Sequence, residues 1–234
     1  MPPTFEEKTA EALCMKTLGL TMTKTLIRAS LIALLLALIV GLPILMHRAS
    51  YAYRKRLRVV TPGKVYRSGQ LTQDGFTDAV RRLNIRTIIN LQNDYPDPDI
   101  PQTYFNQSTT KESELCKKLG VKYVQISPDL LPSYKVPGDR PRAIDEFLKV
   151  MRDTDNYPVL IHCRAGLHRT GCLVAVYRMA FEHWSVNSAF AEMKAHGFGR
   201  ACTASNEYVR QYVLTFDPDY QRPTGKDAAD LKDQ

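Results

Sequence analysis

Apolar and polar positions divide the chain into two regions. Near the N-terminus, residues 29–46 carry no charge, and residues 31–40 are apolar without a break. With its flanks, this run approaches the ~20 residues with which a helix crosses a bilayer. We therefore predict a transmembrane anchor over residues 25–46, after an N-terminal tail of residues 1–24.

A cleaved signal peptide is the alternative interpretation of the same stretch. Ser50-Tyr51-Ala52 has the small residues of a cleavage site, and Met22 is a second start residue close to the apolar run. The run nevertheless exceeds the ~7 to 15 residues of a signal core. An anchor is the favoured prediction, and it makes the chain a single-pass membrane protein.

From residue 65 onward, strand patterns and helix patterns alternate. Runs of β-branched residues predict strands, and apolar residues at helical spacing predict helices between them. Strands are expected at residues 65–68, 86–91, 121–126 and 158–161, and helices at 73–84, 112–119, 170–183, 186–196 and 203–216 and after Asp139. This alternation is typical of the α/β class, with a mainly parallel central sheet flanked by helices.

Capping residues and prolines set the limits of these elements. Thr72 suits the start of a helix, and Gly120 suits the end of one. Residues 93–110 are polar and rich in turn residues, so we expect an irregular excursion there. Three prolines predict a loop over residues 127–138. We place one folded domain at residues 65–216 and a polar, flexible tail at residues 217–234.

The net charge of +8 is concentrated in one short segment. Residues 47–67 contain seven Lys and Arg residues and no acid, and the chain beyond them is neutral overall. A nucleic-acid partner is therefore not expected. We predict that residues 47–64 form a basic juxtamembrane linker, which either keeps the following domain in the cytoplasm or lies on anionic lipid headgroups.

Cysteine and histidine usage gives no sign of a metal site or a disulfide framework. The five cysteines are too few and too scattered for a disulfide-stabilised fold of this length. Four potential ligands cluster in sequence, but their spacing matches no common zinc pattern: His162, Cys163, His168 and Cys172. We expect neither a metal ion nor another cofactor.

The stretch from Cys163 to Arg169 joins a buried strand to a helix, which is where a parallel sheet presents an anion site. Such a loop can turn several backbone N–H groups inward, and Gly166 allows the backbone angles that this needs. A cysteine at the amino end of a helix beside cations titrates below a free thiol. Cys163 is therefore a candidate nucleophile and Arg169 a candidate phosphate clamp, with residues 164–168 as the substrate-binding loop.

This stretch resembles the Cys-x5-Arg signature loop of the protein tyrosine phosphatase superfamily. It is similar in particular to the plant and fungal atypical dual-specificity phosphatases and their bacterial relatives, which share the ending seen here at residues 168–172. A Tyr-Arg-Ser-Gly sequence near the domain start, here residues 66–69, is also shared. The resemblance covers roughly residues 60–215 and implies the cysteine-phosphatase fold.

The resemblance also implies a two-step reaction through a phosphocysteine, without a metal. Cys163 attacks the phosphorus, a general acid protonates the leaving oxygen, and water hydrolyses the intermediate. Thr170 occupies the position whose hydroxyl stabilises the departing thiolate in the family. His162 matches a histidine that orders the loop. The substrate-binding positions are Arg164, Ala165, Gly166, Leu167 and His168.

The general acid has three candidates. The resemblance places the acid on a loop some thirty residues before the cysteine, and Asp129 lies 34 residues before Cys163. Asp139 is a rival, although its place before Arg140-Pro141 suits a helix cap. His168 is a third candidate, because some bacterial relatives carry an Asp at this place; a role in bracing the loop is favoured for it.

The substrate classes implied by the resemblance are ordered as follows. Phosphotyrosine or mixed phosphoprotein hydrolysis comes first, phosphoinositides second and inositol pyrophosphates third. Leu167 stands where the plant and fungal relatives have Lys, which argues against the most highly phosphorylated substrate. A membrane anchor keeps a lipid substrate in view.

Two other functional classes remain open at this point. A membrane-tethered phosphate-binding module would keep Arg169 and the loop amides but lack a working thiolate or acid. A sulfur-transfer or arsenate-reducing enzyme would share a cysteine loop. The Arg-Thr pair after the loop argues against sulfur transfer, and arsenate chemistry needs resolving thiols, of which Cys172 alone is near in sequence.

Overall fold

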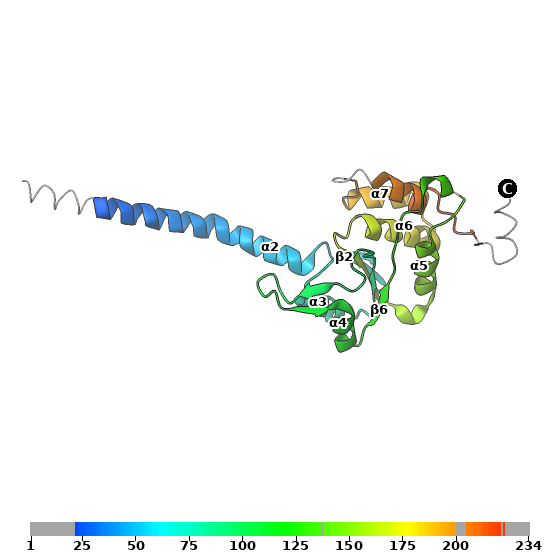
Figure 1. Ribbon diagram of the computed structural model, residues 1–234, viewed down its shortest axis with the longest axis horizontal. Helices are drawn as coiled ribbons and strands as arrows, with labels where there is room; N and C mark the ends of the chain where they lie inside the picture. The colour runs from blue at the N-terminus through cyan, green and yellow to red at the C-terminus, as the bar shows by residue number, and fades with distance from the viewer. Residues whose placement is uncertain (1–21, 137, 200–204, 221, 223–234) are drawn as a thin grey trace, which may run out of the picture. The chain divides into compact units, whose positions relative to one another are not determined.

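The computed structural model describes residues 22–136, 138–199, 205–220 and 222. By their contacts these residues form two units, which divide between Arg48 and Ala49. In the first unit, residues 22–36 are α-helical and lead into a short π-helical segment, η1 (Ala37–Gly41). The helix continues as α2 (Leu42–Arg54), drawn in blue to cyan in Figure 1.

The helix from Met22 to Arg54 has 33 residues and is long and apolar enough to cross a membrane. Its large apolar side chains are exposed to solvent along the whole of the apolar run. A membrane span and a signal sequence share these properties.

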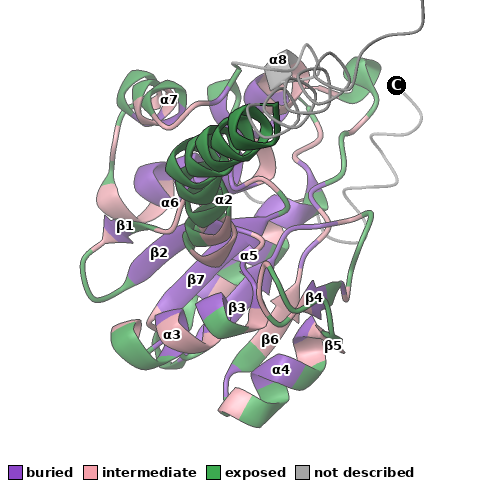
Figure 2. Cartoon of the chain, turned by 90° about the vertical axis from the view of Figure 1, so that its left-hand side faces the viewer, coloured by how far each residue is buried: buried purple, intermediate pink, exposed green. Residues whose placement is uncertain are grey.

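The second unit is built on a five-stranded sheet in the order β1-β2-β7-β3-β6. Its strands are β1 (Arg58–Thr61), β2 (Val65–Gly69), β3 (Thr87–Asn90), β6 (Lys122–Gln125) and β7 (Val159–Cys163). Only β1 runs antiparallel to its neighbour; the other three pairings are parallel. Every residue of β2, β3 and β7 is buried, as the purple strands of Figure 2 show.

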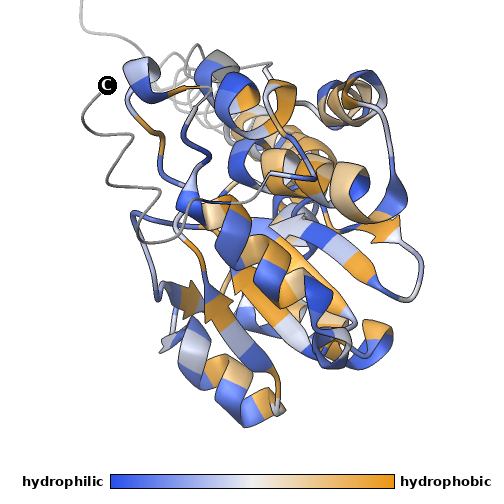
Figure 3. Cartoon of the chain, turned by 90° about the vertical axis from the view of Figure 1, so that its right-hand side faces the viewer, coloured by the Kyte–Doolittle hydropathy of each residue, from blue (hydrophilic) through white to orange (hydrophobic). Residues whose placement is uncertain are grey.

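Helices cover both faces of this sheet and bury two separate apolar clusters. On one face lie α3 (Gln73–Leu83) and α4 (Glu112–Leu119). The helical segments of the other cluster are α5 (Arg142–Arg152), α6 (His168–Glu182), α7 (Val186–Ala195), α8 (Ser205–Val209) and the π-helical η4 (Arg210–Leu214). Along β7, Leu160 joins the first cluster while its two neighbours join the second, because strand side chains alternate between faces. The resulting apolar centre is orange in Figure 3.

The predicted α/β class and mainly parallel sheet are therefore confirmed. The expected caps also form: the Thr72 hydroxyl accepts a hydrogen bond from the Gly75 N–H at 3.2 Å. Gly120 ends α4 in the left-handed conformation, with φ +68°. These local signals act within a few residues, so the pattern of the chain suffices to locate them.

The structure differs from the prediction in three short segments. The expected irregular stretch at residues 93–110 contains a two-stranded sheet, β4 (Asp99–Pro101) with β5 (Thr109–Lys111). Arg58–Thr61, within the predicted linker, forms β1 of the main sheet. Strands of three and four residues are too short to show a clear alternation, so the pattern did not reveal them.

Two helix predictions were also wrong in detail. Pro141, not Asp139, is the N-cap of α5, and no side chain caps that helix. The predicted last helix divides into α8 and η4, with its first two residues outside the described residues. Two short 3-10 turns, η2 (Ser133–Lys135) and η3 (Thr154–Asn156), lie on either side of α5 along the chain.

Candidate active site

The carboxyl ends of three neighbouring parallel strands meet at the signature loop. Cys163 is the last residue of β7, and α6 begins at His168. Gly69, the last residue of β2, is the register partner of Cys163. Asn90, the last residue of β3, is the partner of His162. The loop thus occupies the edge at which parallel α/β sheets bind their ligands.

Three successive carbonyl groups of the loop are tied to surrounding residues. Arg56 Nη1 donates to the oxygen of Ala165 at 2.9 Å, and Arg67 Nη2 donates to the oxygen of Gly166 at 3.1 Å. The backbone N–H of Gln70 donates to the oxygen of Arg164 at 3.2 Å. A planar trans peptide points its N–H opposite to its carbonyl, so the following amides turn towards the inside of the loop.

The Gly166 amide shows the result directly, because it donates to Cys163 Sγ at 3.2 Å. Gly166 has φ +71°, and a Cβ there would lie 2.5 Å from both the nitrogen of Gly69 and the oxygen of Ser68. No other residue fits without moving the backbone of β2. The loop therefore depends on glycine at this position for both its conformation and its close approach to the sheet.

The thiols of the described region lie in different surroundings. Burial raises the pKa of Cys116 to about 12, and burial raises the pKa of Cys172 further. Both thiols therefore stay protonated at neutral pH. Cys163 is also buried, but its sulfur accepts an amide hydrogen bond and lies beside cations. Thr170 Oγ1, at the third position of α6, is buried and has no hydrogen-bond partner among the described residues.

His162 is held by a residue that the sequence did not reveal. Its Nε2 lies 2.6 Å from Glu112 Oε1, and both side chains are fully buried. Gln70 Nε2 donates to the second oxygen of Glu112 at 3.2 Å. Phe76 packs its ring edge-on to the imidazole. This network fixes the side chain next to Cys163 from a helix 50 residues earlier in the chain.

Arg169 is also occupied by a partner that the sequence did not reveal. Its Nη2 donates to Asp94 Oδ2 at 2.9 Å. Burial lowers the pKa of Arg169, but hydrogen bonds with Asp94 and Tyr208 outweigh it and raise the pKa. Asp94 follows β3 and its side chain is largely exposed. A phosphate held by Arg169 has to share the guanidinium with this carboxylate or displace it.

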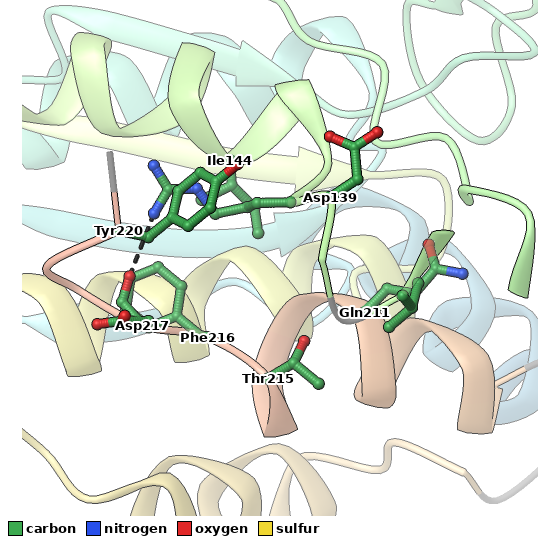
Figure 4. Close-up of a pocket in the computed structure, with 9 residues that line it drawn as sticks. Asp139, Ile144, Gln211, Thr215, Phe216, Asp217 and Tyr220 are labelled. Atoms are coloured by element: carbon green, nitrogen blue, oxygen red, sulfur yellow. Dashed lines mark hydrogen bonds between the residues drawn. The ribbon is translucent and has the colours of Figure 1, made fainter. Parts of the chain in front are cut away.

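The candidate acids differ in their partners. Asn93 Nδ2 donates to Asp129 Oδ1, which links Asp129 to the neighbour of Asp94. Asp139 instead forms an ion pair with Arg222 at 3.3 Å. Both line a cleft of about 980 Å³, and Asp139 also lines the adjoining pocket shown in Figure 4. Only Asp129 is joined to the residues around Arg169.

His168 starts α6 with its ring edge-on to Phe198. Burial and the neighbouring charge of Arg169 lower its pKa below 6.5. The ring is therefore mainly neutral at pH 7, which disfavours it as a proton donor. The packing fits the loop-bracing role that the sequence favours.

The residues brought together here come from widely separated parts of the chain. Those that the sequence did not reveal as site residues are Lys55, Arg56, Asp94, Glu112 and Tyr208. None carries a local motif; each acts through a tertiary contact with the loop. Among the described residues, no group of three His, Cys, Asp or Glu side chains is placed to hold a metal ion.

A model of the tyrosine phosphatase family matches residues 55–230. The chain belongs to this family. Inositol diphosphatase SIW14 of Saccharomyces cerevisiae is 28% identical over 152 residues, which are 64% of this chain and 48% of that protein. Inositol diphosphatase DSP4 of Arabidopsis thaliana is 33% identical over 104 residues, 44% of this chain and 50% of that protein. The chain thus spans about half the length of these relatives.

Solved structures agree with the family. The crystal structure of the core catalytic domain of PP-IP phosphatase SIW14 from S. cerevisiae, in complex with citrate, has a TM-score of 0.50 and 25% identity to this chain. The likeness covers 70% of this chain and 87% of that one. The cysteine-phosphatase fold expected from the signature loop is therefore confirmed.

Removing Glu112 should expose how much the site depends on its buried network. We expect Glu112→Ala to lower the free energy of unfolding by about 3–5 kcal/mol, because it leaves His162 buried without its partner. Glu114→Ala is the matched control, since Glu114 lies in the same first turn of α4 but is exposed. Urea unfolding of the full chain in neutral detergent measures both. An equal loss of unfolding free energy in the two variants would contradict this. It would show that Glu112 contributes no more than another acidic residue in the first turn of α4.

Proposed function

We propose that this chain is a cysteine-dependent phosphatase that removes the terminal phosphate of inositol pyrophosphates. The supporting observation is the signature loop, in which Cys163 Sγ accepts the Gly166 amide while the loop carbonyls are tied outward. This arrangement surrounds the sulfur with donors for the oxygens of a phosphoryl group. Arg169 adds a fork of N–H donors at the amino end of α6.

The residues have distinct roles in this proposal. The Cys163 thiolate attacks phosphorus in line and forms a phosphocysteine as the bond to the leaving oxygen breaks. Arg169 and the loop amides stabilise the charge on the transferred phosphoryl group. Water then hydrolyses the intermediate, and the Thr170 hydroxyl donates to the departing thiolate. That hydroxyl has no other partner in the described part of the chain, so it is free for this role.

The relatives bear on the choice of substrate. Several relatives that the chain matches are named inositol diphosphatases, from yeast and from plants. The sequence placed this substrate class last, after phosphotyrosine and phosphoinositides, because Leu167 lacks a charge. We now place it first and keep phosphotyrosine second, since the family as a whole is described as tyrosine phosphatases.

A diphosphate also changes what the general acid has to do. Its leaving group is a phosphate with a pKa of about 6, whereas tyrosine leaves as a phenol with a pKa of about 10. The first departs readily without a proton, and the second needs one. We assign the proton donor to Asp129, supported by its link through Asn93 to the neighbourhood of Arg169.

A turnover panel tests the proposed function. We expect the full chain in neutral detergent to release phosphate from an inositol pyrophosphate, with a chelator present, faster than from phosphotyrosine peptides, phosphoserine peptides or phosphoinositides. Cys163→Ser should abolish release from every substrate. Turnover that survives in the Ser variant would contradict the mechanism. Phosphate binding without turnover would instead favour a tethered binding module.

Replacing Asp129 should separate the two kinds of leaving group. We expect Asp129→Asn to lower kcat for a phosphotyrosine peptide by about 100-fold or more and to change kcat for an inositol pyrophosphate far less. Asp139→Asn is the control and should leave the ratio of the two rates unchanged. A uniform loss on both substrates with Asp129→Asn would remove it as the proton donor.

We also propose that residues 25–46 anchor the protein in a membrane, supported by the length and apolar character of the helix from Met22 to Arg54 that contains them. The chain should remain in the membrane pellet after alkaline carbonate extraction and enter solution with detergent. Its mass should include the apolar helix. A soluble product that starts after Ala52 would identify the segment as a cleaved signal peptide.

A further inference from the structure

The turn after α2 carries a lysine that lies across the end of β2. The backbone oxygen of Lys55 accepts from the Gly69 N–H at 2.7 Å, and the backbone N–H of Lys55 donates to the oxygen of Tyr51 at 2.7 Å. A Cβ on Gly69 would lie 2.9 Å from Lys55 Cγ and 3.0 Å from Cδ. The aliphatic stem of Lys55 therefore passes directly over Gly69, the register partner of Cys163.

The same turn is fixed to the loop by its next residue. Arg56 has φ +59°, a conformation that residues other than glycine rarely adopt. Its guanidinium donates to the oxygen of Ala165 at 2.9 Å and lies over the ring of Tyr51. Hydrogen bonds of Lys55 and Arg56 thus fix the backbone of this turn and hold Lys55 beside the loop.

The signature loop itself supplies little positive charge for a large anion. Arg169 is paired with Asp94, and His168 is mainly neutral because burial and Arg169 lower its pKa. Leu167 packs towards Gly197. Within the loop this leaves Arg164, whose side chain is exposed. A substrate with several phosphates needs further cations from outside the loop.

Lys55 is such a cation from outside the loop, and its surroundings favour the binding of an anion. Burial lowers its pKa, and the neighbouring charges of Arg164 and Arg56 lower it further, whereas the charge at Cys163 raises it. Three cations therefore lie close to one another, and Lys55 also lies close to Cys163. A polyanion placed among them would relieve their mutual repulsion as well as form new hydrogen bonds.

We propose that Lys55 is a substrate-binding residue, and that its ammonium group contacts a second phosphate of a substrate whose reacting phosphate lies in the loop. The inference rests on the proposed function for the identity of the substrate, an inositol ring carrying several phosphates. The cation is supplied from the segment just before the sheet, in place of a basic residue at position 167. It would discriminate multiply phosphorylated ligands from those with a single phosphate.

Binding to a chain that cannot turn over tests this without depending on catalysis. Cys163→Ser is the common background, and the full chain in neutral detergent is titrated calorimetrically with inositol hexakisphosphate and with inorganic phosphate. Lys55→Met should weaken the affinity for inositol hexakisphosphate by about tenfold, which corresponds to the loss of one charge-assisted hydrogen bond. It should change the affinity for inorganic phosphate much less. Lys55→Arg should restore most of the affinity.

Arg54→Met is the matched control, because it removes the adjacent charge while its side chain is exposed and holds no loop group. The inference fails if Lys55→Met and Arg54→Met behave alike, if Lys55→Met weakens both ligands equally, or if inositol hexakisphosphate does not bind. A failure of the proposed function appears separately, as an absence of inositol pyrophosphate turnover in the unmodified chain. In that case, a selective effect of Lys55→Met would still establish the polyanion site.

Discussion

Outward attachment of the loop carbonyls is the constraint on which the site depends. Arg56, Arg67 and the Gln70 amide hold three successive carbonyls, and the Gly166 amide consequently points at the sulfur. Only glycine fits at position 166, because a Cβ there would lie 2.5 Å from backbone atoms of β2. Two of the three donors lie on β2 or directly after it, so the parallel pairing of β2 with β7 sets the shape of the anion site.

Buried charge is the second feature of the site, and its arrangement is uneven. His162 and Glu112 form a dry pair behind Cys163, and burial lowers the pKa of Arg67 to about 10 without neutralising it. Arg169 is balanced by Asp94, whereas Lys55 lies close to two other cations, Arg56 and Arg164, and to Cys163. The proposed function draws on these neighbouring cations to hold a highly charged anion.

The sequence located what depends on local pattern. The strand, loop and helix around Cys163, the Thr72 and Gly120 caps and the parallel sheet follow from residues close together in the chain. The sequence did not reveal three residues of the site: Glu112, Asp94 and Arg56. Each contacts the signature stretch across at least 50 residues of chain, and none belongs to a motif. The basic segment illustrates the limit well: its charge is plain in the sequence, but its contact with the loop arises only when β1 and β2 fold together.

The phosphocysteine is the intermediate on which the whole interpretation turns. A rapid acid quench of the full chain during turnover of an inositol pyrophosphate, followed by mass spectrometry of its peptides, detects it directly. We expect a phosphoryl group on Cys163, at higher occupancy in Thr170→Ala because the thiolate then departs more slowly. Release of phosphate with no phosphoryl group on Cys163 at any quench time, in either protein, would contradict covalent catalysis by this cysteine.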